Sequence, residues 1–132
     1  MHPGPGDPAP LRVVVVDADD RVRESVSRLI CIGARLEVVG TAGEPDPALE
    51  VVRSTRPDVV VVDPRLPEVD GGLEFLRNLR QTAPDVRVLV MSGTDLPQLA
   101  EVTPLVDGVV KKTFRATELL TAILGATVIA LG

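Results

Sequence analysis

Two carboxylates, one hydroxyl and one ammonium group each follow a short apolar run in this sequence, at Asp17, Asp63, Ser92 and Lys112. Continuous β-branched runs such as Val59–Val62 are typical of strands buried on both faces of a parallel sheet. In such sheets the residues that follow the strands meet in a crevice at the carboxyl edge. We therefore expect these four side chains to surround one crevice.

The types of these side chains indicate phosphoryl chemistry. Two facing carboxylates repel each other, so Asp17 and Asp63 call for a cation between them, and their oxygen atoms suit magnesium. A metal ion, the Lys112 ammonium and the Ser92 hydroxyl would offset charge on a phosphoryl group while a carboxylate attacks in line. The set predicts phosphorylation of an aspartate. A simpler interpretation of Asp63 alone is a turn cap, because Asp is common where strands become loops.

Strand and helix patterns alternate along the chain. Apolar and β-branched runs predict five strands, at residues 11–17, 36–41, 59–62, 86–91 and 108–111. Apolar residues at helical spacing predict five helices that begin near residues 20, 45, 70, 96 and 119. Short loops between them imply right-handed crossovers. We predict a doubly wound α/β fold with a five-stranded parallel sheet in the flavodoxin-like order 2-1-3-4-5.

Composition indicates one domain, at residues 11–132, after a proline- and glycine-rich leader at 1–10 that we expect to be disordered. A net charge of -5 and only two aromatic residues oppose direct contact with nucleic acid or with an anionic membrane. Cys31 is the only cysteine, and we expect it to be a small buried side chain on the first helix. The lack of a secretion signal or a spanning apolar run predicts a cytoplasmic location.

Taken together, the motif residues resemble those of a known family. They are Asp17 after the first strand, Asp63 followed by Pro67 and by Asp70-Gly71, then Ser92-Gly93, and Lys112-Thr113-Phe114. From Leu11 to about Leu124 the chain resembles the receiver domains of two-component response regulators. It is most similar to receivers that carry a helix-turn-helix output domain.

This resemblance implies a role for each residue. Asp63 would be the phosphoacceptor, and Asp17, Asp63 and the backbone carbonyl of Arg65 would hold Mg²⁺. Ser92 would donate a hydrogen bond to the phosphoryl group, and Lys112 would form an ion pair with the free or phosphorylated carboxylate. The implied partners are a sensor histidine kinase and an output domain or partner protein. A homodimer through the fourth helix, fifth strand and fifth helix is also implied, and no enzyme activity.

Three positions depart from the family pattern. Ala18 stands where most receivers have a second acid, so one metal ligand is missing and magnesium binding should be weaker. Val109 replaces an aromatic residue whose rotamer usually reports phosphorylation to the outer face. Thr113 follows Lys112 where the family has proline.

Two alternatives remain open from the sequence. Ala18 and Val109 also suit a degenerate receiver that binds partners without being phosphorylated. The sequence from Val13 to Asp19 resembles the nucleophile motif of haloacid-dehalogenase-type phosphatases, with Asp17 as nucleophile and Asp19 as acid or base. Against the phosphatase, no paired acids follow Lys112 and the chain is short for such an enzyme.

Overall fold

A parallel sheet of five strands forms the centre of the molecule. The computed structural model describes residues 9–32, 35–66, 68–92, 99–111 and 119–124. Its strands are β1 (Leu11–Val16), β2 (Leu36–Ala42), β3 (Val59–Val62), β4 (Arg87–Ser92) and β5 (Gly108–Lys111). They lie in the order β2-β1-β3-β4-β5, which confirms the predicted flavodoxin-like topology, and each predicted strand is correct to within one residue at either end.

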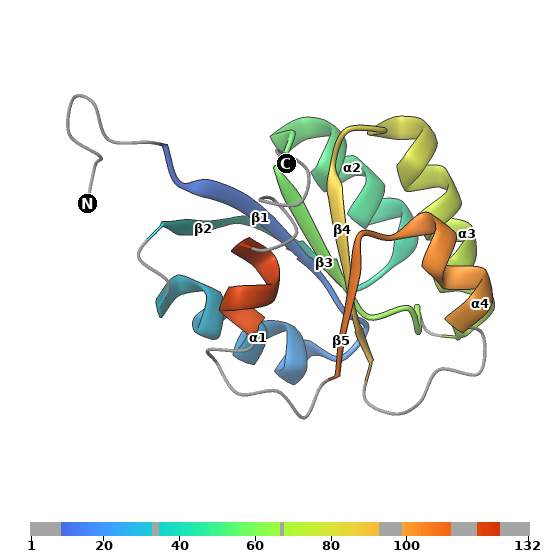
Figure 1. Ribbon diagram of the computed structural model, residues 1–132, viewed down its shortest axis with the longest axis horizontal. Coiled ribbons are helices and arrows are strands. Elements are labelled where there is room, and N and C mark those ends of the chain that lie inside the picture. The colour runs from blue at the N-terminus through green and yellow to red at the C-terminus, as the bar shows by residue number, and fades with distance from the viewer. Residues whose placement is uncertain (1–8, 33–34, 67, 93–98, 112–118, 125–132) are drawn as a thin grey trace.

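Helices cover both faces of this sheet (Figure 1). They are α1 (Asp20–Ile32), α2 (Pro45–Thr55), α3 (Val69–Thr82), the short α4 (Leu99–Val102) with the 3-10 turn η1 (Thr103–Leu105), and the helical residues 119–124. One face packs against α2, α3 and α4, and the other against α1 and residues 119–124. The predicted start of α4 at Leu96 lies outside the described residues.

Valine side chains from β1 and β3 alternate between these two layers. Val14, Val16, Val60 and Val62 belong to the core beneath α2 and α3, and the intervening valines belong to the core beneath α1. All eight valines of the two strands are fully buried. A strand that is covered on both faces needs no polar alternation, which explains the continuous valine runs.

One local expectation from the sequence is wrong. Cys31 is exposed, and so is Ile32 beside it, because Val26 and Ile30 occupy the buried face of α1 and Cys31 is turned about 100° from Ile30. Helix α3 begins at Val69, one residue before its predicted start, so Asp70, Gly71 and Gly72 lie in its first turn.

Some expectations fall outside the described residues, which include only residues 9 and 10 of the predicted leader. No helix among the described segments is long and apolar enough to cross a membrane.

Candidate functional site

Asp17 and Asp63 directly follow two adjacent central strands that end in register. Val16 of β1 pairs with Val62 of β3, and the amide of Asp63 donates a 3.0 Å hydrogen bond to the carbonyl oxygen of Val16. Neighbouring strands lie about 4.8 Å apart, so the two acids stand side by side at the carboxyl edge of the sheet. Asp17 is 2% exposed and Asp63 8%, and within the described ranges they are the buried charged residues.

Each of these carboxylates is held by the backbone of its own loop. Oδ1 of Asp17 accepts a 2.9 Å hydrogen bond from the amide of Asp19, and Oδ1 of Asp63 accepts one of 2.8 Å from the amide of Arg65. Bonds from an Asp to the amide two residues later are typical of Asx turns. They fix both side chains at the edge of the sheet before any ligand arrives.

The acids fit a magnesium ion. Burying two neighbouring carboxylates is costly without a cation nearby, and Mg²⁺ is commonly bound through one or two protein carboxylates while it keeps several water ligands. Asp17 and Asp63 are groups of this edge that could hold such an ion. Within the described ranges, no group of three or more His, Cys, Asp or Glu side chains is placed to hold a metal ion.

The acids that follow Ala18 have other interactions. Ala18 itself is exposed. Oδ1 of Asp19 accepts hydrogen bonds from the amides of Arg21 (2.9 Å) and Val22 (3.3 Å), so Asp19 caps the first turn of α1. Asp20 forms an ion pair with an arginine of the same helix. Neither side chain takes the place of the missing second acid in this arrangement.

The loop after Asp63 lies tightly against the start of α3. A Cβ atom on Gly72 would be 1.5 Å from the carbonyl oxygen of Pro64, and one on Gly71 would be 2.4 Å from that of Leu66. No other residue type fits at Gly72 unless the backbone moves. Two adjacent glycines at the start of a helix are themselves a sequence signal of close backbone approach.

The remaining predicted site residues are only partly placed. Ser92 is the last residue of β4 and pairs with Lys111 of β5. The structure describes its backbone but not its side chain. Lys112, Gly93 and Thr113 lie outside the described residues. The ends of β1 and β3 thus come together as predicted, whereas the hydroxyl and the ammonium group remain predictions.

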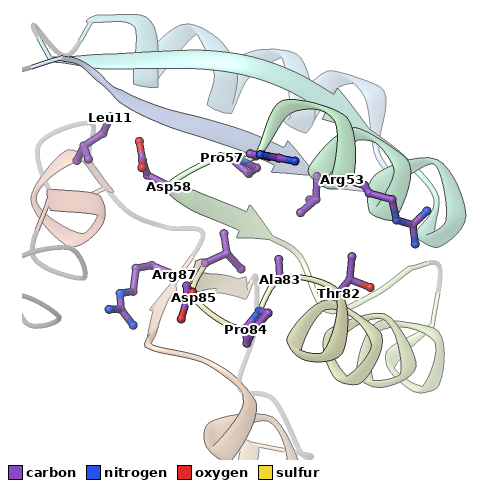
Figure 2. A pocket seen from close by; sticks show the side chains of 12 residues that line it. Leu11, Arg53, Pro57, Asp58, Thr82, Ala83, Pro84, Asp85 and Arg87 are labelled. Atoms are coloured by element: carbon purple, nitrogen blue, oxygen red, sulfur yellow. The ribbon is translucent and has the colours of Figure 1, made fainter.

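A pocket of about 590 Å³ lies at the opposite, amino-terminal edge of the sheet (Figure 2). Its lining comes from the first residues of β1, the segments before β3 and β4, and the ends of α2 and α3. In Figure 2 the side chains of Arg53 and Arg87 extend away from the space between them. Because Asp17 and Asp63 follow the other ends of the strands, this pocket is separate from the acidic site.

Comparison with known proteins gives a consistent match. Residues 13–124 match the response regulator receiver domain family. The chain is 42% identical over 94 residues to protein-glutamate methylesterase/protein-glutamine glutaminase 5 of Anaeromyxobacter dehalogenans (70% of this chain, 25% of that protein). It is 38% identical over 114 residues to response regulator MprA of Mycolicibacterium vanbaalenii (84% and 48%). The chain thus spans between a quarter and about half of these relatives.

Solved structures agree with this match. The signal receiver domain of NarL from Mycobacterium tuberculosis superposes with a TM-score of 0.82 at 31% identity, covering 91% of this chain and 98% of the other. A LuxR-family two-component response regulator from Aurantimonas gives a TM-score of 0.80 at 32% identity, covering 89% and 84%.

Proposed function

Because this chain belongs to the response regulator receiver domain family, we propose that Asp63 accepts a phosphoryl group from a sensor histidine kinase and that this changes partner binding. The observation that carries the proposal is the pair of buried carboxylates at the in-register ends of β1 and β3. Asp63 directly follows β3, one of the two central strands, and the amide of Arg65 already fixes its orientation. An acceptor held in this way needs little reorganisation to react.

The reaction transfers one phosphoryl group between two nucleophiles. A carboxylate oxygen of Asp63 forms the new bond to phosphorus. The bond from phosphorus to the kinase histidine breaks, and the imidazole nitrogen keeps the electron pair. Receiver domains generally bind Mg²⁺ for this reaction, and the metal supplies neutralisation of charge at the phosphoryl oxygens. Asp17, Asp63 and the Arg65 carbonyl would hold it.

Ser92 and Lys112 complete the proposed site. The Ser92 hydroxyl would donate a hydrogen bond to the phosphoryl group, and the Lys112 ammonium would pair with its charge. The position of Ser92 at the end of β4, beside β3, supports its part of the proposal.

Partner and location belong to the same proposal. Since the chain covers at most about half of the curated relatives cited above, we assign the output to a further domain or a separate protein. A homodimer through α4, β5 and residues 119–124 is one form of such a contact. The receiver domain, at residues 11–132 after the leader, would act in the cytoplasm without turnover of its own and without touching nucleic acid directly.

The direct test is uptake of a phosphoryl group from a small donor. The full chain is incubated with Mg²⁺ and acetyl phosphate, and intact mass is recorded for the wild type, Asp63→Asn and the matched control Asp85→Asn. Asp85 is an exposed acid at the opposite edge of the sheet. We expect a gain of one phosphoryl group in the wild type and the control only. No gain in the wild type at saturating Mg²⁺ would favour the degenerate receiver, and a gain in Asp63→Asn would assign the acceptor elsewhere.

A further inference from the structure

Arg23 reaches back from the first turn of α1 to the end of β1. Its Nη1 donates a 2.8 Å hydrogen bond to the backbone carbonyl oxygen of Asp17, and its Nη2 pairs with the carboxylate of Asp20. The Arg23 side chain is 22% exposed, whereas that of Arg28, one turn later in the same helix, is 76% exposed. Arg23 is therefore a fixed part of the turn after β1 and not a solvated helix charge.

Gly43 provides the space that the guanidinium of Arg23 occupies. A Cβ atom at position 43 would lie 2.6 Å from Nη1 of Arg23 and 3.4 Å from the carbonyl oxygen of Asp17. Gly43 follows Ala42, the last residue of β2, whose carbonyl oxygen accepts a 3.1 Å hydrogen bond from the amide of Asp17. The guanidinium thus lies where β1 and β2 end.

We propose that Arg23, seated on Gly43, is a positioning residue for the magnesium site, an inference that rests on the function proposed above. Both backbone polar groups of Asp17 are tied down, the amide by Ala42 and the carbonyl by Arg23. The backbone of Asp17 is held on both sides, and its carboxylate is then set by the Asp19 amide.

Ala18 makes the site depend on this arrangement. A receiver with two consecutive acids after β1 could lose the placement of one and keep the other. Here Asp17 is the one buried acid of the turn, since Asp19 caps α1 and Asp20 is paired with Arg23. Groups that orient a metal ligand without touching the metal commonly change affinity by about 10- to 100-fold when removed. A displaced Asp17 backbone should have an effect of that size.

The first measurement is Mg²⁺ binding without a phosphodonor. Binding to the full chain is monitored through its amide chemical shifts. We expect Arg23→Ala to raise the half-saturating Mg²⁺ concentration by about 10- to 100-fold. Arg23→Lys should restore part of the affinity, because an ammonium group can still donate to the Asp17 carbonyl. Arg28→Ala is the matched control, since Arg28 pairs with Glu24 on the surface of the same helix, and it should leave binding unchanged.

A double-mutant cycle separates positioning from general destabilisation. Gly43→Ala should weaken Mg²⁺ binding when Arg23 is present, because the new methyl group displaces the guanidinium. In the Arg23→Ala background the same change should add little, since the space is then empty. Additive effects of the two substitutions, or an Arg23→Ala affinity equal to that of the wild type, would overturn the proposal.

A second readout needs no metal. The Asp19 amide donates to Oδ1 of Asp17, so its hydrogen exchange in the metal-free protein reports how well the turn is held. Arg23→Ala should accelerate this exchange and leave amides in the middle of α3 unchanged. If the wild type bound no Mg²⁺, the proposed metal site would be wrong, while exchange at Asp19 would still decide the role of Arg23. Unchanged exchange would refute that role.

Discussion

The amide of Asp63 donates a 3.0 Å hydrogen bond to the carbonyl oxygen of Val16, the residue that precedes Asp17. This bond continues the ladder between β1 and β3, each of which has a further strand on its other side. The distance between the backbones of the two acids is therefore set by the pairing of β1 and β3 at the centre of the sheet, where the valine side chains are fully buried. Substitutions in the loops should change how the carboxylates are oriented more than how far apart their backbones lie.

At Gly72, a single added methyl group should strongly lower both the stability of the protein and its phosphoryl uptake. Within a helix, replacing glycine by alanine normally stabilises a protein by about 1 kcal/mol. At Gly72 the added Cβ would lie 1.5 Å from the carbonyl oxygen of Pro64, so the loop that follows Asp63 must move. We expect Gly72→Ala to cost about 3 kcal/mol of unfolding free energy and to abolish phosphoryl uptake by the folded fraction.

Gly108→Ala is the control for this prediction. Its Cβ would meet Cδ1 of Leu89 at 3.0 Å, a contact with the movable end of a side chain. Its effect should stay within about 1 kcal/mol. Urea unfolding followed by circular dichroism measures both variants, because the chain has no tryptophan or tyrosine. Equal stabilities of the two variants would contradict the prediction, because the loop after Asp63 would then move aside for the Gly72→Ala methyl group at little cost.

Much of the fold follows from the sequence because few residue types carry it. The runs ending at Val16 and Val62 have no polar interruption, and only strands covered on both faces suit such runs. The pairing of Asp17 with Asp63 at one edge follows from the same pattern, since parallel strands that are neighbours end together. Cys31 shows the limit of this reasoning, because apolar neighbours do not tell which side of a helix a residue faces.

The details that tune the site depend on distances between residues far apart in the chain. Gly43 lies beneath Arg23 only because β1 and β2 are neighbours, and Gly72 meets Pro64 only because α3 folds back on the loop after β3. No local pattern tells which distant residue each glycine meets. The resemblance to receivers implied roles for Ser92 and Lys112, and those roles stay predictions.

Arg80 should contribute more to stability than any arginine in a surface ion pair. Its guanidinium donates to the carbonyl oxygens of Leu105 (2.7 Å) and Val86 (2.8 Å) and to Oδ2 of Asp107 (2.8 Å). The same Oδ2 accepts the amide of Val88 at 2.8 Å. Arg80→Met would leave the buried Val86 carbonyl and the partly buried Leu105 carbonyl without their donor, and we expect a loss of about 2–3 kcal/mol in urea unfolding.

Arg53→Met provides the comparison for Arg80. Arg53 is 60% exposed and pairs with Glu50 three residues earlier in α2, at 3.1 Å. Exposed pairs of this kind contribute about 0.5 kcal/mol or less. If both variants lost the same small amount of unfolding free energy, the hydrogen bonds of Arg80 would not be important for holding the segment before β5 against α3.

Restoring an acid at position 18 should strengthen magnesium binding. Ala18 is exposed and follows Asp17 directly, so Ala18→Asp adds a third carboxylate next to the two buried ones. We expect about tenfold tighter Mg²⁺ binding, since carboxylate oxygens are preferred ligands of this ion. Without metal, the extra like charge should lower the unfolding free energy by about 1 kcal/mol, and saturating Mg²⁺ should reverse that loss. Ala18→Asn, which has the same shape without the charge, should show neither effect.

Both variants are titrated with Mg²⁺, and unfolding is measured without metal and at saturation. Equal affinities for Ala18→Asp and Ala18→Asn would mean that position 18 does not face the ion.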